Sequence, residues 1–175
     1  MRVLETERLR LRSWTLEDLD DFYEYAKRLE VGPNAGWKPH ACKEESEKIL
    51  KSFIEKDDIW AIELKENKKV IGSIGFQKDE HRNGINSKML GYVLSKDYWG
   101  LGIMTEASKE VIRYGFEEEK LDIISVYHFR FNYKSKRVIE KCGFKYEGTL
   151  RRGRKLFDGR IVDLVFYSIL KEEFK

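Results

Sequence analysis

Hydrophobic positions follow two different periods along this chain. Leu9 and Leu11 alternate with arginines, a period of two that is typical of a half-buried strand. Thr15 and Asp18 form a helix-start pattern, and the apolar residues that follow recur every three or four positions as far as Leu29. The same analysis predicts further helices around 49–54, 104–116 and 135–142, and strands at 59–64, 70–76, 89–94, 122–129, 144–150 and 162–170.

The order of these elements indicates the fold class. Three consecutive strands between residues 59 and 94 are joined by short polar turns, one of them carrying Asn83-Gly84, which favours an antiparallel meander. The strand, helix, strand succession over 89–129 is a crossover unit and predicts one parallel pair. Residues 31–40, punctuated by Gly and Pro, are expected to form a loop. We therefore predict an α+β fold with a mixed, mostly antiparallel seven-stranded sheet and flanking helices, in a single domain over residues 1–175.

The composition fits a globular domain and argues against membrane residence. Hydrophobic residues make up 41% and charged residues 37% of the 175 positions, and no apolar run approaches the ~20 residues of a membrane helix. The opening MRVLETERLRLRS is charged throughout and has no signal-peptide pattern, which predicts a cytoplasmic protein. Cys42 and Cys142 lie far apart in the sequence, so they indicate neither a metal site nor a disulfide framework.

The net charge of +3 hides a basic segment. Residues 128–160 hold eleven Lys or Arg and three Asp or Glu, so this segment carries +8 and the remainder −5. Such a segment can meet phosphate, nucleic acid or an acidic partner, or it can be a plain solvated face.

Two segments carry candidate chemistry. Gly100 and Gly102 stand where a strand gives way to a helix, so a ligand can approach the backbone there, and the first helical turn offers N–H groups to a phosphate. Asn132 follows the next strand, and the basic residues Lys134 and Lys136 begin the helix after it, where cations are unfavourable unless an anion is near. The alternatives are a tight turn at the glycines and ordinary helix capping at Asn132. Neither a third glycine nor a Gly-Lys-Ser/Thr triplet is present for the known nucleotide motifs.

Taken together, these segments resemble the GNAT superfamily of N-acetyltransferases, and most closely its Rim-type branch, which includes ribosomal-protein N-acetyltransferases. The resemblance spans nearly the whole chain, through ETERLRLRSWTLEDLDDF, GYVLSKDYWGLGIMTEA, NYKSKRVIEKCGFKYEGTLR and DGRIVDLVFYSIL. It implies acetyl-CoA as the cofactor, CoA as its product, and a V-shaped opening between the fourth and fifth predicted strands that takes the pantetheine arm. Asp97 departs from the motif, which usually has Arg or Gln at that place.

The resemblance also implies roles for particular residues. The backbone around Leu94 would meet the pantetheine arm, and Asn132, Ser135 and Lys136 would contact the pantetheine and a phosphate. Trp37 and His40 lie in the loop that lines the acceptor cleft in this family, and His128 is a further candidate for contact with the substrate. The backbone N–H groups that would hold the pyrophosphate belong to Trp99, Gly100, Leu101, Gly102, Ile103, Met104 and Thr105.

Acetyl transfer to an amine needs a neutral amine, a donor for the developing oxyanion and a proton for the leaving thiolate. Ser135 is the candidate catalytic residue, as the proton source. Met89 stands where many relatives carry a glutamate base, so the base is sought elsewhere. The candidates are Asp79, Glu80, His81 and His128.

The sequence thus predicts an acetyl-CoA-dependent N-acetyltransferase that works by direct attack in a ternary complex. The acceptor is a primary amine, either a protein N-terminus or a small molecule, and no metal, membrane or DNA partner is expected. A homodimer is an expectation at the level of the family only. The alternatives are a catalytically silent acyl-CoA-binding protein and an RNA- or ribosome-binding protein, which the interleaved aromatics of the basic segment would suit. However, these aromatics, Tyr127, Phe129, Phe131 and Tyr133, are predicted to alternate along one strand, as core and cleft residues would.

Overall fold

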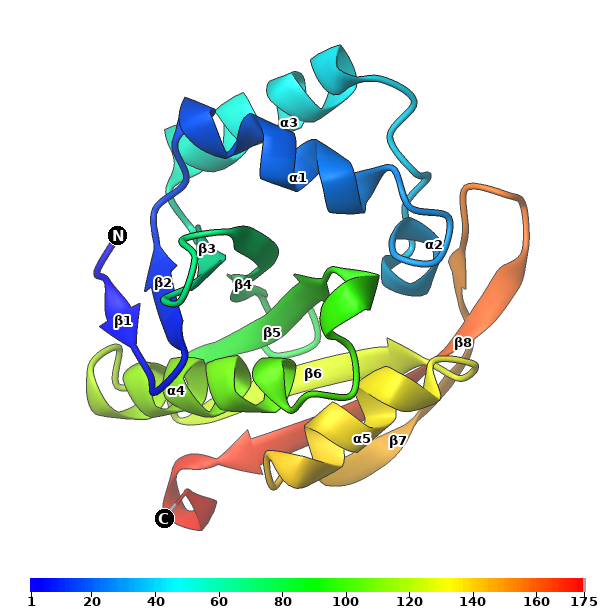
Figure 1. The fold of residues 1–175 in the computed structure, drawn as a ribbon. Coiled ribbons are helices and arrows are strands. Elements are labelled where there is room, and N and C mark those ends of the chain that lie inside the picture. Colours follow the sequence, from blue (N-terminus) through cyan, green and yellow to red (C-terminus); the bar gives the residue numbers. More distant parts are fainter. Residues whose placement is uncertain (175) are drawn as a thin grey trace. The chain divides into compact units, whose positions relative to one another are not determined.

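The computed structural model describes residues 1–174 (Figure 1). Its strands are β1 (Leu4–Glu5), β2 (Leu9–Arg12), β3 (Ile59–Leu64), β4 (Val70–Lys78), β5 (Ser87–Leu94), β6 (Ile123–Phe129), β7 (Lys145–Lys155) and β8 (Ile161–Leu170). Its α-helices are α1 (Leu19–Ala26), α2 (Gly32–Ala35), α3 (Lys43–Lys56), α4 (Ile103–Glu117) and α5 (Tyr133–Lys141). Single 3-10 turns are η1 (Leu16–Asp18), η2 (Lys96–Tyr98) and η3 (Lys171–Glu173).

The strands form one mixed sheet in the order β1-β2-β3-β4-β5-β6-β8-β7. Pairing is antiparallel for β1–β2, β2–β3, β3–β4, β6–β8 and β7–β8. β5 and β6 pair in parallel through residues 87–89 and 123–125. The predicted α+β class with a mostly antiparallel sheet is confirmed. The predicted strand count was one too low for the described residues, because the two-residue β1 is too short to show a period.

By contact density the chain divides into two compact units. The first comprises residues 1–75 and 92–107, and the second comprises residues 76–91 and 108–175. The boundary runs through β4, β5 and α4, so these elements contribute residues to both units. The prediction of a single domain stays a prediction.

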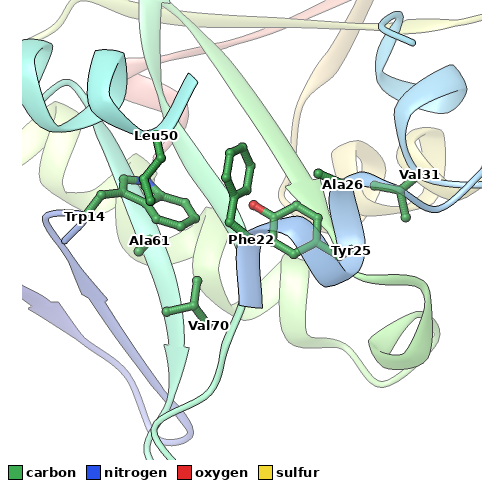
Figure 2. Close-up of a cluster of buried hydrophobic side chains, with 8 residues drawn as sticks. All are labelled: Trp14, Phe22, Tyr25, Ala26, Val31, Leu50, Ala61 and Val70. Atoms are coloured by element: carbon green, nitrogen blue, oxygen red, sulfur yellow. The ribbon is translucent and has the colours of Figure 1, made fainter. Parts of the chain in front are cut away.

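The first unit has an aromatic core beneath α1 and α3 (Figure 2). Trp14, Phe22 and Tyr25 are almost fully buried, and the Phe22 ring lies 5.3 Å from Trp14 and 5.5 Å from Tyr25. Leu50 of α3 completes this cluster with no exposed surface. Truncating such a residue to alanine costs about 2–5 kcal/mol, so this core holds the two helices firmly on β3 and β4.

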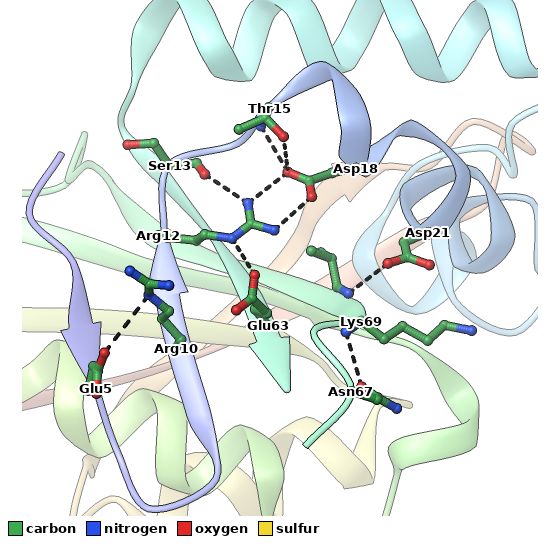
Figure 3. Close-up of polar contacts among 11 residues, drawn as sticks. Glu5, Arg10, Arg12, Ser13, Thr15, Asp18, Asp21, Glu63, Asn67 and Lys69 are labelled. Carbon is green, nitrogen blue, oxygen red and sulfur yellow. Dashed lines mark hydrogen bonds and ion pairs between the residues drawn. The ribbon is translucent and has the colours of Figure 1, made fainter. Parts of the chain in front are cut away.

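A buried ion network fixes the start of η1 against the sheet in the same unit (Figure 3). Arg12 of β2 donates to both carboxylate oxygens of Asp18, at 2.7 and 2.8 Å, and to Glu63 of β3 at 2.5 Å. Asp18 also accepts from the Thr15 backbone N–H at 2.8 Å. The Thr15–Asp18 spacing that predicted a helix start therefore works as a capping interaction.

In the second unit α4 approaches the sheet very closely at Gly115. A Cβ there would lie 2.9 Å from Phe76 Cζ and 3.0 Å from Ile124 Cδ1, so a larger residue would require these side chains to move. α5 buries Ile139. β8 pairs with the whole of β6 through residues 164–170, and β7 pairs with the other side of β8. Within residues 1–174 no helix has both the length and the apolar character needed to cross a membrane.

Two local predictions were wrong. Residues 31–40 contain the short helix α2, with Pro33 in its first turn and Gly36 ending it in the left-handed region at φ 90°. The aromatics predicted to alternate along one strand do so only as far as Phe129, because β6 ends there. Phe131 and Tyr133 lie beyond it and are exposed.

Candidate functional site

The turn between β5 and α4, in the first unit, has the geometry that the sequence predicts. Gly100 and Gly102 have φ values of 81° and 78°, a region that L side chains rarely adopt. A Cβ at Gly100 would have no atom within 4 Å, so the turn is open on that side. The first helical bond of α4 runs from the Glu106 N–H to the Gly102 carbonyl at 3.0 Å. The amides of Ile103, Met104 and Thr105 precede that bond, at the positively polarised end of the helix.

These features fit a phosphate group. The turn has two residues without side chains, its backbone conformation depends on them, and it leads straight into the first turn of a fifteen-residue helix. Ile103 and Met104 turn their side chains inward and are 3% and 5% exposed, so their amides rather than their side chains are available to a ligand.

The strand that leads to this turn is held close to its neighbour. A Cβ on Gly72 of β4 would lie 2.3 Å from the Val93 carbonyl oxygen and 3.2 Å from Leu94 Cα. Ser95 N–H donates to the Ile71 carbonyl at 2.8 Å, and the Trp99 indole N–H donates to the Leu94 carbonyl at 2.9 Å. Leu94 and Trp99 are therefore joined to each other, and both belong to the first unit.

Asp97, which departs from the family motif, has a partner of its own. Its carboxylate accepts from the Arg28 guanidinium at 2.8 Å. The neighbouring Lys96 pairs with Glu30. Residues just after α1 thus hold η2 in place. Asp97 accepts a hydrogen bond there, whereas the Arg or Gln of the motif would donate one.

Asn132 and Ser135 lie together at the start of α5, in the second unit. The Asn132 side chain caps the helix by accepting from the Ser135 backbone N–H at 3.1 Å. Lys136 lies one residue further on and pairs with Glu140 at 3.6 Å. The capping interpretation of Asn132 is therefore correct, and it leaves the predicted cofactor contacts of Asn132, Ser135 and Lys136 as proposals.

His128 is buried at the end of β6, also in the second unit. Its Nδ1–H donates to the Phe129 carbonyl at 2.8 Å, which leaves the lone pair on Nε2. Burial lowers the pKa of His128, so the ring is neutral near pH 7. Among the described residues Nε2 has no hydrogen-bond partner.

Trp37 and His40 belong to the first unit and face its core. Trp37 packs on the aromatic cluster, and a Cβ on Gly32 would lie 2.6 Å from its ring. His40 is 7% exposed, with its ring 5.3 Å from Phe22 and its Nδ1 2.6 Å from the Ser46 hydroxyl. Burial lowers the pKa of His40. Both residues fix the segment between α2 and α3, and their contact with a substrate stays a prediction.

A buried polar network of the second unit includes the residue that pairs with Met89. Met89 of β5 lies opposite Ser125 of β6, and the Ser125 hydroxyl donates to Asp79 at 2.7 Å. Asp79 also accepts from Arg82 at 2.7 Å and from the His81 N–H at 3.0 Å. Although burial alone would raise the pKa of Asp79, these hydrogen bonds outweigh it and hold the pKa below its usual value.

The contacts of Asp79, Glu80 and His81 indicate which of these candidates can act as the base. Asp79 is ionised and both its oxygens accept hydrogen bonds, so it is a poor proton acceptor for a substrate. Glu80 lies 3.4 Å from Lys78 at the surface. His81 is exposed and sets its ring edge-on to Phe166 at 4.8 Å. Sequence reasoning named Asp79 without its partners Arg82 and Ser125, because no local pattern connects them.

Sequence reasoning also missed Arg8 and Glu106, which contact the glycine turn within the first unit. Arg8 Nη1 donates to the Leu101 carbonyl at 3.0 Å, and its Nε donates to Glu106 at 2.7 Å. Both residues lie inside the segments that carry the family resemblance, ETERLR and IMTEA, and that position was the available signal.

Known proteins share sequence and fold with this chain. The model of the acetyltransferase (GNAT) domain family matches residues 8–145. N-acetyltransferase p20 of Bacillus licheniformis is 31% identical over 179 residues, which cover 99% of this chain and 99% of that protein.

Solved structures share the fold. An acetyltransferase of the GNAT family from Bacillus anthracis superposes with a TM-score of 0.88 at 24% identity, covering 98% of this chain and 99% of that one. The microcin C7 self-immunity acetyltransferase MccE, solved in complex with acetyl-CoA and AMP, superposes with a TM-score of 0.82 at 21% identity. That alignment covers 94% of this chain and 93% of MccE.

Proposed function

Because the chain belongs to the GNAT family of acetyltransferases and uses acetyl-CoA, we propose that it transfers the acetyl group to a primary amine. The acceptor is the α-amine of a protein N-terminus or the amine of a small molecule, and it attacks directly in a ternary complex. The observation that carries the proposal is the open turn with Gly100 and Gly102 at positive φ, directly before the first helical bond of α4.

Different groups of the chain bind different parts of acetyl-CoA. The backbone N–H groups from Gly100 to Thr105 hold the pyrophosphate. The Trp99 N–H, which the family resemblance implied, does not belong to this set, because it donates to the Lys96 carbonyl at 3.1 Å. The backbone at Leu94 holds the pantetheine arm. Asn132, Ser135 and Lys136 supply polar contacts from the start of α5. When bound, acetyl-CoA supplies an activated thioester carbonyl and a thiolate leaving group.

Direct attack is favoured because no cysteine suits a covalent intermediate. Burial raises the pKa of Cys142 to about 11, so this thiol is protonated near pH 7 and is a weak nucleophile. Cys42 is exposed at the residue before α3, away from both candidate segments in the sequence. The expected kinetic pattern is intersecting initial-rate lines, and parallel lines would show an acyl group held on the enzyme.

Proton transfer is assigned to a few residues. Ser135 donates the proton that the leaving sulfur takes up, and its hydroxyl regains a proton from water. His81 and His128 are the candidates for accepting the proton of the amine, since Asp79 is committed to Arg82 and Ser125. The variants H81Q and H128Q separate them: loss of the acidic limb of the pH–rate profile in one of them identifies the base.

Isothermal titration with acetyl-CoA, CoA and ATP tests the cofactor assignment first. Micromolar binding of acetyl-CoA and CoA but not ATP is expected, followed by CoA release when a panel of N-terminal peptides and small amines is added. The variant C142S should keep full turnover. Tight binding with no turnover on any amine would favour a silent acyl-CoA-binding protein, and binding of none of the three would remove the proposal.

A further inference from the structure

One residue connects the N-terminal hairpin to the glycine turn. The guanidinium of Arg8 bonds the Leu101 carbonyl through Nη1 at 3.0 Å and the Glu106 carboxylate through Nε and Nη2, both at 2.7 Å. Its backbone N–H donates to the same carboxylate at 2.9 Å, and the Thr6 hydroxyl adds a bond of 2.5 Å. Three hydrogen bonds and one further ion-pair contact from one short turn therefore converge on Glu106 at the start of α4.

The turn that makes these bonds is itself rigid. Thr6 N–H donates to the Leu9 carbonyl at 3.0 Å, and Leu9 N–H donates to the Thr6 hydroxyl at 3.1 Å. Lys65 N–H donates to the Arg8 carbonyl at 3.0 Å, which joins Arg8 to the end of β3. Arg8 thus connects the end of β3, through its backbone carbonyl, to the glycine turn, through its guanidinium.

The bond to Leu101 fixes a peptide plane. The peptide between Leu101 and Gly102 is trans and planar, so its carbonyl and its N–H point in opposite directions. Because Arg8 holds the carbonyl on its own side, the Gly102 N–H is directed away from Arg8. Gly102, on one side of this peptide, has no side chain to restrict its rotation, so the bond from Arg8 restrains the plane.

Arg8 also compensates the negative charge of Glu106. Glu106 lies in the first turn of α4, where a carboxylate would compete with a bound phosphate and repel it. Burial would raise the pKa of Glu106, but the bonds from Thr6 and Arg8 outweigh that effect and lower it, so Glu106 is ionised. The guanidinium of Arg8 neutralises it at contact distance.

We infer that Arg8 is a positioning residue for cofactor binding: it orients the Leu101–Gly102 peptide so that the Gly102 N–H faces the pyrophosphate, and it cancels the charge of Glu106. The inference rests on the proposed assignment of the 100–105 backbone to the pyrophosphate. It adds a requirement for an arginine at a position outside both candidate segments.

The test compares R8Q with R10Q by calorimetry with acetyl-CoA. Arg10 is a matched control, because it lies on the same hairpin, its side chain is 49% exposed against 44% for Arg8, and its partner is Glu5 at 3.9 Å. R8Q should raise the Kd for acetyl-CoA about tenfold, the effect of losing a charged hydrogen bond. R10Q should stay within about twofold of the wild type.

R8K keeps the charge but lacks the fork that reaches Leu101 and Glu106 together, so its Kd should also rise. This variant decides the matter if R8Q does not fold. A wild-type Kd in R8K or R8Q, with only the melting temperature lowered, would overturn the inference and leave the proposed function standing. Absence of acetyl-CoA binding in the wild type would overturn both.

Discussion

The buried network around Arg12 makes a strong prediction about stability. Arg12 donates four hydrogen bonds, to Asp18, to Glu63 and to the Ser13 carbonyl. The side chains of Asp18 and Glu63 are only 7% and 10% exposed. R12M would leave two carboxylates buried without their cation, and breaking a buried pair in this way costs about 3–5 kcal/mol.

Arg113 of α4 provides the matched control. It donates three charged hydrogen bonds, two to Glu110 and one to Glu117, at 2.6–3.0 Å. Its own side chain is 35% exposed, and those of Glu110 and Glu117 are 17% and 53% exposed, so water screens these pairs more than the pairs of Arg12. R113M should therefore cost only about 0.2–1 kcal/mol although it removes similar bonds.

Thermal and urea unfolding followed by circular dichroism measure the difference. With about 2–4 °C per kcal/mol for a chain of this size, R12M should lower the melting temperature by about 6–20 °C and R113M by less than about 4 °C. The double variant R12M/E63Q should recover part of the loss, since it removes one stranded charge. Equal shifts for R12M and R113M would refute the reasoning that burial decides the strength of these pairs.

Three further predictions concern the candidate site. G102V forces a branched side chain into φ 78°, a strain of about 1–3 kcal/mol, and should weaken acetyl-CoA binding at least tenfold by calorimetry. The control G84V, at φ 74° in another loop, should leave the Kd for acetyl-CoA unchanged. An unchanged Kd for G102V would contradict the assignment of the turn. Asp79 has a lowered pKa in the folded state, so its stabilisation is complete above its unfolded pKa of about 3.9 and is lost as pH falls through the folded value. D79N should lower the free energy of unfolding by about 2 kcal/mol at pH 7. It should also reduce the slope of the unfolding free energy against pH below about pH 4. An unchanged slope would exclude this role of Asp79. N132A should lose about 1 kcal/mol of cap energy in urea unfolding and bind acetyl-CoA more weakly, while N132S should restore stability but not affinity; full affinity in both would remove Asn132 from the site.

The sequence by itself determined most of the secondary structure and the glycine turn. Periodicity is a local property, so the helix at 104–116 and the strands at 59–64 and 122–129 agree closely with α4, β3 and β6. Gly100 and Gly102 were identifiable for the same reason, because a positive φ is a requirement of one residue. The family resemblance then gave the class of enzyme and its cofactor, which the comparisons support.

Only the tertiary structure decided which side chains meet. Arg8 and Glu106 are 98 positions apart, Arg12 and Glu63 are 51 apart, and Asp79 and Ser125 are 46 apart. An arginine or a carboxylate has the same local pattern whether it is solvated or paired, so no period distinguishes these residues from the many other charges of a chain that is 37% charged. Burial and partner are set by the order of strands in the sheet, and that order is a property of the whole fold.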